Sequence, residues 1–146
     1  MKFNILVSVL TLLLLSTYFL TSNGQDSSKT ELSVEQVYEK ANNDSTVLLL
    51  DVRTEPEFDG ELGHVPGSIL ITLSELEARL EELIPYKERE ILVICRSGNR
   101  SGQATKVLRE NGYNALNMVG GMRAWNKMIE SIEIDSTGNQ NETITK

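Results

Sequence analysis

Two nearly continuous apolar runs constrain the fold of this chain more than any other feature. They are "STVLLLDVR" (45–53) and "REILVIC" (89–95), and each ends in polar or reactive residues. A strand with one face in water alternates apolar and polar residues, whereas a strand covered on both faces is apolar throughout. The two runs therefore predict central strands of a parallel sheet that is covered on both sides.

Helical patterns and shorter strands lie between and around these runs. The segment 32–44 predicts a helix capped by Ser33. The segment 74–85 predicts an amphipathic helix with Ser74 as its cap, Glu77 completing a capping box and Pro85 just past its end. Further expected elements are short strands at 68–73 and 114–119, helices at 101–113 and 120–130, and a turn-rich loop at 55–67.

Strands that alternate with helices through short links predict an α/β fold. We expect a central, mostly parallel, five-stranded sheet with helices on both faces. Sites in such sheets form just beyond the carboxyl ends of the strands. Cys95 ends one of the apolar runs, so we interpret it as a functional residue and not as part of the core.

The first 24 residues have the pattern of a secretory signal. Lys2 precedes the apolar, uncharged segment 5–20, and small residues precede a cleavage point before Gln25. This is the order of a signal peptide, and an uncleaved N-terminal membrane anchor is the alternative. We expect export to the periplasm or the cell exterior. The expected segments are a signal peptide at 1–24, a polar lead at 25–31 and a disordered polar tail at 131–146.

Charge and composition argue against several classes of partner. The 146 residues carry 14 Lys and Arg against 21 Asp and Glu, a net charge of −7. Nucleic acids and anionic membranes are bound through clustered Lys and Arg. One Cys and one His cannot make a zinc site. We therefore expect no nucleic acid, no metal and, after cleavage of the signal, no membrane partner, and we expect a monomer.

The only cysteine, Cys95, opens the polar loop "CRSGNRS". Gly98 and Gly102 let the backbone curl so that successive N–H groups point at one centre, an anion-binding nest. The helix predicted from Ser101 adds its positive end, and the two loop arginines add positive charge. Such a loop lowers the pKa of a thiol and makes its thiolate a nucleophile.

Three ordered stretches resemble the signatures of the single-domain rhodaneses, a family of sulfurtransferases. "LLDVRTEPEFDGELGHVPGSI" (49–69) resembles the first signature, "CRSGNRS" (95–101) the active-site loop and "VGGMRAW" (119–125) the closing signature. The resemblance implies a rhodanese-like domain over residues 32–130. The chain departs from the family pattern at Thr72, where a proline is common, and at Arg123, where an apolar residue is common.

The resemblance implies a double displacement at Cys95 that needs no cofactor. The thiolate attacks the outer sulfur of a small donor such as thiosulfate, and the resulting persulfide passes its sulfur to cyanide, a small thiol or a protein thiol. The residues expected to bind the substrate or the persulfide are those of the loop, with Arg100 stabilising charge: Arg96, Ser97, Gly98, Asn99 and Arg100.

Four residues are expected to support the loop. Asp51 and Arg53 are two residues apart, so they face the same side of a strand and can pair, either to order the loop or as a purely structural pair. His64, the only histidine, resembles the family's loop-fixing residue, which bonds to backbone. Ser101 is interpreted as a helix N-cap.

Two other functions remain open from the sequence. A phosphatase or arsenate reductase on the same fold also uses a Cys loop closed by Arg, but resembles C-x5-R, whereas Cys95 and Arg100 form C-x4-R. The shorter loop suits a single sulfur atom better than a tetrahedral phosphate. A persulfide carrier or binding module that serves a partner protein is the second alternative.

Overall fold

The computed structural model describes residues 29–138 of the chain. The signal peptide predicted at 1–24 and the part of the tail at 139–146 lie outside the described residues. Five strands form one sheet in the order β1-β5-β4-β2-β3, and every pairing is parallel. This confirms the predicted sheet. The strands are β1 (Glu31–Leu32), β2 (Leu48–Asp51), β3 (Ile69–Leu70), β4 (Glu90–Ile94) and β5 (Asn114–Met118).

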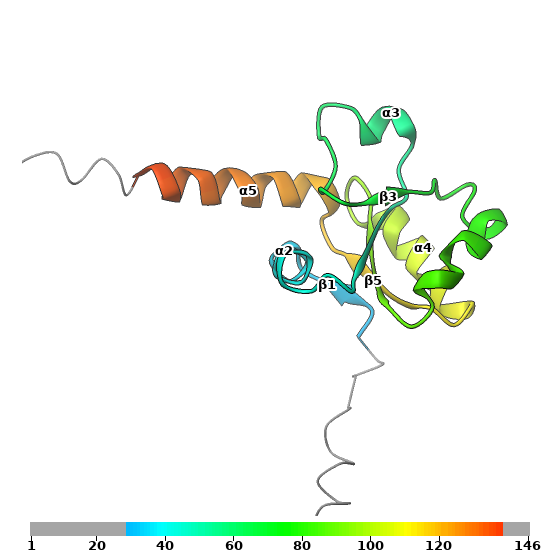
Figure 1. The fold of residues 1–146 in the computed structure, drawn as a ribbon. Coiled ribbons are helices and arrows are strands. Elements are labelled where there is room, and N and C mark those ends of the chain that lie inside the picture. Colours follow the sequence, from blue (N-terminus) through cyan, green and yellow to red (C-terminus); the bar gives the residue numbers. More distant parts are fainter. Residues whose placement is uncertain (1–28, 139–146) are drawn as a thin grey trace, which may run out of the picture.

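Helices cover both faces of the sheet, as predicted (Figure 1). Side chains alternate along each strand, so Ile91 and Val93 pack on one face while Leu92 and Ile94 pack on the other. One face packs against α4 and η1, and the other against α2 and α5. The helices are α2 (Val34–Asn43), α3 (Glu55–Phe58), the 3-10 helix η1 (Glu77–Tyr86), α4 (Asn99–Glu110) and α5 (Gly121–Gly138).

The predicted cap of the first helix is confirmed. Ser33 is the N-cap of α2, its hydroxyl accepts from the Gln36 N–H, and the Gln36 side chain accepts from the Ser33 N–H. Val34 and Val37 are buried on the inner face of this helix. Reciprocal capping satisfies donors that the first turn leaves free, so it fixes where the helix begins.

A helix is present in the segment 74–85, as predicted, but its predicted cap and end are wrong. The segment forms the 3-10 helix η1, Pro85 lies inside it, and the Ser74 hydroxyl bonds to Thr72 instead of capping a helix. Apolar side chains recur at every third position, Leu80, Leu83 and Tyr86, and all pack against the core. This spacing fits three residues per turn, in which such side chains eclipse each other.

Two further boundaries differ from the prediction. Leu32 belongs to β1, which the sequence pattern missed because two residues are too few to show a period. The tail predicted to be disordered from residue 131 is helical as far as Gly138. The first turns of α5 are anchored by the buried Met122 and Trp125, and extending a helix that has begun costs little.

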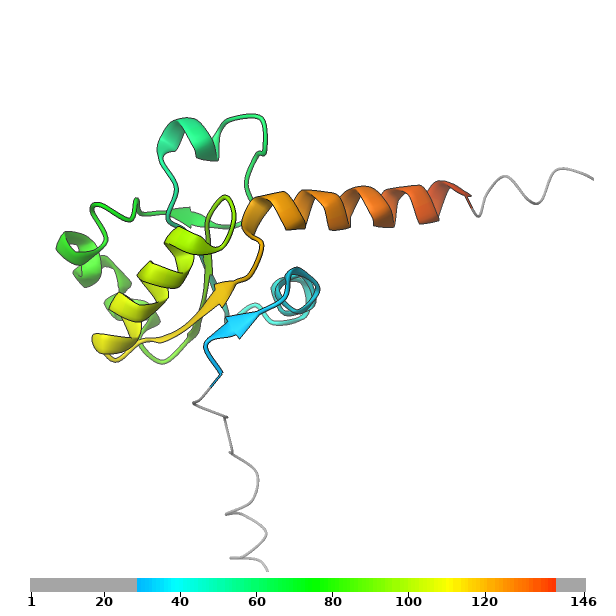
Figure 2. The same cartoon turned by 180° about the vertical axis from the view of Figure 1, so that it is seen from behind.

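The far end of α5 projects from the rest of the molecule (Figures 1 and 2). Residues 130–136 are exposed along it. Among the described residues, no helix is both long and apolar enough to cross a membrane.

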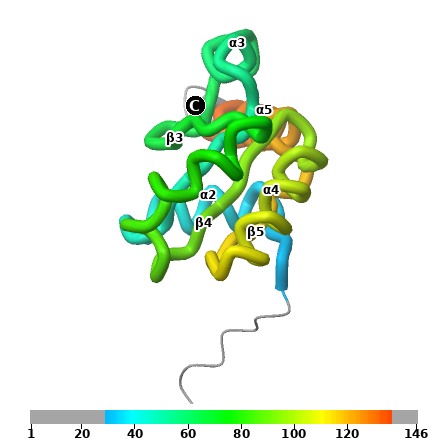
Figure 3. The backbone as a smooth tube through the Cα atoms, turned by 90° about the vertical axis from the view of Figure 1, so that its right-hand side faces the viewer, coloured from blue at the N-terminus to red at the C-terminus, as the bar shows by residue number. Residues whose placement is uncertain are grey.

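The short helix α3 lies at one end of the molecule in all three views (Figure 3).

Candidate active site

Cys95 follows β4 directly and lies beyond the carboxyl end of that strand. This confirms the predicted location, but the expectation that Cys95 lies outside the core is wrong, because the residue is 0% exposed and packs in the core beneath α4. The reason is that the loop after Cys95 folds back over its side chain. The thiol is therefore covered by its own loop in this structure.

The loop places two donors on the sulfur atom. The Gly98 N–H lies 3.1 Å from Cys95 Sγ, and the Ser101 hydroxyl lies 3.2 Å from it. Gly98 has a φ of +95°, a conformation that favours glycine, and is the N-cap of α4. Because the helix begins at Asn99, Ser101 lies within its first turn. The interpretation of Ser101 as an N-cap is therefore wrong, and its hydroxyl contacts the sulfur instead.

The polar contacts offset the effect of burial on the thiol. Burial, the largest single influence, raises the pKa of Cys95. The Ser101 hydroxyl and the backbone N–H groups of Ser101, Ser97 and Gly98 lower it, and together they bring the pKa below that of an ordinary cysteine. Hydrogen bonds to an anion favour the charged form. The arrangement thus fits the predicted nest and favours a thiolate.

Arg100 does not contact the sulfur in this structure but pairs with Glu57 of α3. Its two terminal nitrogens lie 2.7 and 2.6 Å from the two carboxylate oxygens of Glu57, a bidentate ion pair. This partner was not predicted from the sequence. The two residues are 43 positions apart, so no local pattern indicates the contact; the Thr54 N–H, which donates to Glu57 Oε2 at 3.2 Å, helps to hold the carboxylate in place.

Asp51 and Arg53 form a buried ion pair. Arg53 bonds both carboxylate oxygens of Asp51 at 2.8 to 3.0 Å, and the two side chains are 0% and 1% exposed. Arg53 also donates to the carbonyl oxygens of Glu57, at 2.9 Å, and Gly63, at 2.7 Å. The pair therefore holds the segment 57–63. Glu57 links this pair to Arg100 of the active-site loop, and Asp51 also interacts electrostatically with Arg100.

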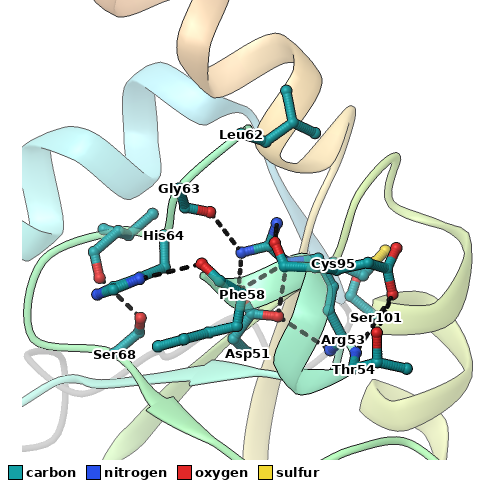
Figure 4. Close-up of polar contacts among 12 residues, drawn as sticks. Asp51, Arg53, Thr54, Phe58, Leu62, Gly63, His64, Ser68, Cys95 and Ser101 are labelled. Carbon is teal, nitrogen blue, oxygen red and sulfur yellow. Dashed lines mark hydrogen bonds and ion pairs between the residues drawn. The ribbon is translucent and has the colours of Figure 1, made fainter. Parts of the chain in front are cut away.

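His64 contacts the backbone, as the resemblance implied. Its Nδ1 lies 3.2 Å from the Phe58 carbonyl oxygen, and its ring stacks on Phe58 with centroids 3.9 Å apart (Figure 4). Both contacts fix the segment that follows α3. Nothing in this geometry brings the imidazole to Cys95 Sγ.

The start of α5 supports the loop from the other side. Met122 N–H donates to the Cys95 carbonyl oxygen at 2.8 Å, and Arg123 N–H donates to the Arg96 carbonyl oxygen at 3.1 Å. A glycine at position 121 makes this approach possible, because a Cβ there would lie 2.6 Å from Ser97 N. The closing signature 119–125 therefore builds the floor of the site.

Comparison with known proteins decides the family. A family model described as the rhodanese-like domain matches residues 33–128. The chain belongs to the rhodanese-like family. The putative sulfur carrier protein YrkF of Bacillus subtilis is 36% identical over 119 residues, which cover 77% of this chain and 62% of YrkF. This chain thus spans less than two thirds of that relative.

Two further comparisons agree with this assignment. The thiosulfate sulfurtransferase PspE of Escherichia coli is 36% identical over 74 residues, which cover 51% of this chain and 69% of PspE. The crystal structure of a rhodanese-like domain protein from Staphylococcus aureus matches with a TM-score of 0.60 and 28% identity, covering 66% of this chain and 90% of that chain. The predicted family and fold are confirmed.

The remaining loop residues of the rhodanese-like domain face outward. Arg96, Ser97 and Asn99 are exposed. Arg96 also lines a cavity of about 180 Å³ together with Glu57 and Leu62. Their predicted role in binding substrate stays a prediction. Within residues 29–138, no three His, Cys, Asp or Glu side chains gather as they would to hold a metal ion.

We expect the Glu57–Arg100 pair to make the stability of the domain depend on acid pH. The bond to Arg100, the main cause, lowers the pKa of Glu57 from 4.5 to about 2. Its contribution to stability is therefore fully present above pH 4.5 and is lost as the pH falls towards about 2. Unfolding by urea between these pH values measures the loss. Glu57→Gln should remove this component, whereas Glu61→Gln, on the same segment, should retain it.

Proposed function

We propose that this protein is a sulfurtransferase that carries a sulfane sulfur as a persulfide on Cys95. The observation that carries the proposal is the pair of donors on Cys95 Sγ, Gly98 N–H and the Ser101 hydroxyl, at the carboxyl end of β4. These donors stabilise a thiolate before reaction and an anionic sulfur after it. The names of the relatives YrkF and PspE support the same chemistry.

The reaction proceeds in two displacements. In the first, the Cys95 thiolate attacks the outer sulfur of thiosulfate, the sulfur–sulfur bond of the donor breaks, and sulfite leaves with the electron pair. In the second, an acceptor thiolate or cyanide attacks the outer sulfur of the persulfide. The new sulfur–sulfur bond breaks and Cys95 leaves as a thiolate, ready for another cycle. With cyanide the product is thiocyanate, and no cofactor takes part.

The contact between Arg100 and Glu57 supports this chemistry over phosphatase chemistry on the same fold. An oxyanion bound in the loop would use the guanidinium fork of Arg100, and that fork is held by both oxygens of Glu57. Four residues separate Cys95 from Arg100, which leaves a loop suited to one sulfur atom. A sulfur carrier for a partner protein is the second candidate, supported by the name of YrkF.

The same proposal includes the setting in which the protein acts. The sequence of residues 1–24 supports export, to the periplasm or the cell exterior. We propose that it acts there as a monomer on a small sulfur donor, with cyanide, a small thiol or a protein thiol as acceptor. In an oxidising compartment a reductant or partner keeps Cys95 reduced or persulfidated.

The intact mass of the purified protein, before and after incubation with thiosulfate, tests the proposal. We expect a gain of one sulfur atom that cyanide reverses with release of thiocyanate. Cys95→Ser should show no gain. A wild-type protein with a free thiol and no gain would rule out thiosulfate as donor. Incubation with a low-molecular-weight persulfide then tests the carrier function, and no gain from either donor would refute sulfur transfer.

A further inference from the structure

A buried asparagine lies next to Ser101 on the neighbouring strand. Asn117 belongs to β5, is 5% exposed and is flanked by the apolar Leu116 and Met118. Its Oδ1 lies 2.6 Å from Ser101 Oγ, while its Nδ2 lies 3.5 Å from a carboxylate oxygen of Glu31. Burying an amide in an apolar sheet is costly unless its hydrogen bonds are made. The short bond to Ser101 is the strong contact of this side chain.

Ser101 has one proton and two acceptors within reach. Its oxygen lies 3.2 Å from Cys95 Sγ and 2.6 Å from Asn117 Oδ1. A hydroxyl donates one hydrogen bond and accepts up to two, so Ser101 cannot serve both acceptors at once. When it donates to Asn117, the sulfur loses this donor. When it donates to the sulfur, Oδ1 faces the lone pairs of the hydroxyl oxygen at a repulsive distance.

We propose that Asn117 is a positioning residue that sets the direction of the Ser101 hydroxyl according to the charge on Cys95. With a neutral thiol, Ser101 donates to Asn117 Oδ1. With a thiolate, the side-chain amide of Asn117 turns by half a turn and Nδ2 donates to Ser101 Oγ. Ser101 then donates to Cys95 Sγ, and the three side chains form a chain of hydrogen bonds that ends on the anion.

The surroundings of Asn117 permit this turn. The turn breaks the weak contact of Nδ2 with Glu31 and brings Oδ1 towards that carboxylate, so it requires the exposed Glu31 side chain to move away. Asn117 also lines a cavity of about 270 Å³ together with Gly102 and Thr105. The Thr105 hydroxyl, also at this cavity, is buried and makes no hydrogen bond to any residue from 29 to 138. Polar atoms around the amide are therefore not all committed to the orientation seen here.

Other charges act on the same sulfur and must be separated from the effect of Asn117. Arg100 on the loop interacts electrostatically with Cys95 and with Asp51 of β2, and Asp51 is paired with Arg53. Glu31 of β1 contacts the amide at 3.5 Å, and the charged residues of α4 that line the same cavity are Lys106, Arg109 and Glu110. None of these groups donates to Ser101 among the contacts of the described residues. A change that acts through Ser101 can thus be distinguished from one that acts through charge.

The test is the pKa of Cys95 in a double-mutant cycle, read from the ultraviolet absorbance of the thiolate as a function of pH. In Asn117→Asp, the carboxylate presents only acceptors to Ser101. The Ser101 hydroxyl therefore keeps donating to position 117 and not to Cys95 Sγ. We expect the pKa of Cys95 to rise by about one to two units, a ten- to hundredfold lower ratio of thiolate to thiol. In the Ser101→Ala background the same substitution should cause a much smaller rise, from its charge alone.

Asn114→Asp is the control, because Asn114 lies on the same strand. The substitution adds the same negative charge at a position outside the hydrogen bonds that Ser101 makes among the described residues. It should leave the pKa of Cys95 nearly unchanged. Equal shifts from Asn117→Asp in the two backgrounds, or no shift in either, would overturn the proposal. In the unmodified protein, the NMR chemical shifts of the Asn117 side-chain amide should change with pH, with a midpoint at the pKa of Cys95. Chemical shifts that do not change across this pH range would also overturn the proposal.

This inference rests on the proposed function, in which the anion of Cys95 is the reactive form, but its measurement does not involve sulfur transfer. A coupled pKa without any gain of sulfur would retain Asn117 as a positioning residue and reject the proposed donors. A gain of sulfur together with a pKa of Cys95 that does not depend on Asn117 through Ser101 would retain the proposed donors and reject Asn117 as a positioning residue.

Discussion

Replacing Arg53 by methionine should lower the free energy of unfolding by about 3–5 kcal/mol. The substitution removes the guanidinium that pairs with the carboxylate of Asp51, which is 0% exposed. It also leaves the carbonyl oxygens of Glu57 and Gly63 without their donor. An unpaired buried charge is costly, whereas the methionine retains much of the apolar stem. Urea unfolding of the two proteins at neutral pH measures the difference.

Two variants show whether the loss comes from the broken pair. Arg79→Met removes a partly exposed arginine that pairs with Glu75 and Glu82, and it should change the stability by at most about 1 kcal/mol. Combining Asp51→Asn with Arg53→Met removes both charges and should recover part of the loss. An Arg53→Met protein as stable as the wild type would contradict this account. So would a double variant whose loss of stability equals the sum of the losses of Arg53→Met and Asp51→Asn alone.

The parts of the fold that follow from local pattern were predictable from the sequence. The buried runs that became β2 and β4 are uninterrupted, so their place in a doubly covered parallel sheet follows from composition alone. The Ser33 cap and the position of Cys95 after β4 follow from patterns a few residues long. Rules that relate residues close together in the sequence were enough to predict these features.

The contacts that complete the site were not predictable in this way. Arg100 and Glu57 are 43 residues apart in sequence, and Ser101 and Asn117 are 16 apart, so no local pattern announces either pair. The loop pattern showed that Arg100 carries a charge near Cys95, but not that Glu57 neutralises it. The burial of Cys95 was not predictable either, because whether the loop folds over this residue depends on how closely α5 approaches the loop.

That approach makes Gly121 the position with the second large expected effect. Gly121 has a φ of +56°, and a Cβ there would lie 2.6 Å from Arg96 C and Ser97 N. A non-glycine residue in this conformation costs about 1–3 kcal/mol, and forcing the loop and the helix apart adds about 1–3 kcal/mol. We expect Gly121→Ala to lower the free energy of unfolding by about 2–6 kcal/mol, measured by urea unfolding.

Gly63 separates the two causes, because its φ is also +56° but nothing lies within 4 Å of where its Cβ would be. Gly63→Ala therefore bears the conformational strain without the clash, and it should cost less than Gly121→Ala by the part due to crowding. Only Gly121→Ala displaces the backbone of Arg96 and Ser97, so only this variant should gain sulfur from thiosulfate more slowly in the intact-mass experiment. Equal losses of stability and of sulfur uptake in the two variants would mean that the close approach of α5 does not shape the loop around Cys95.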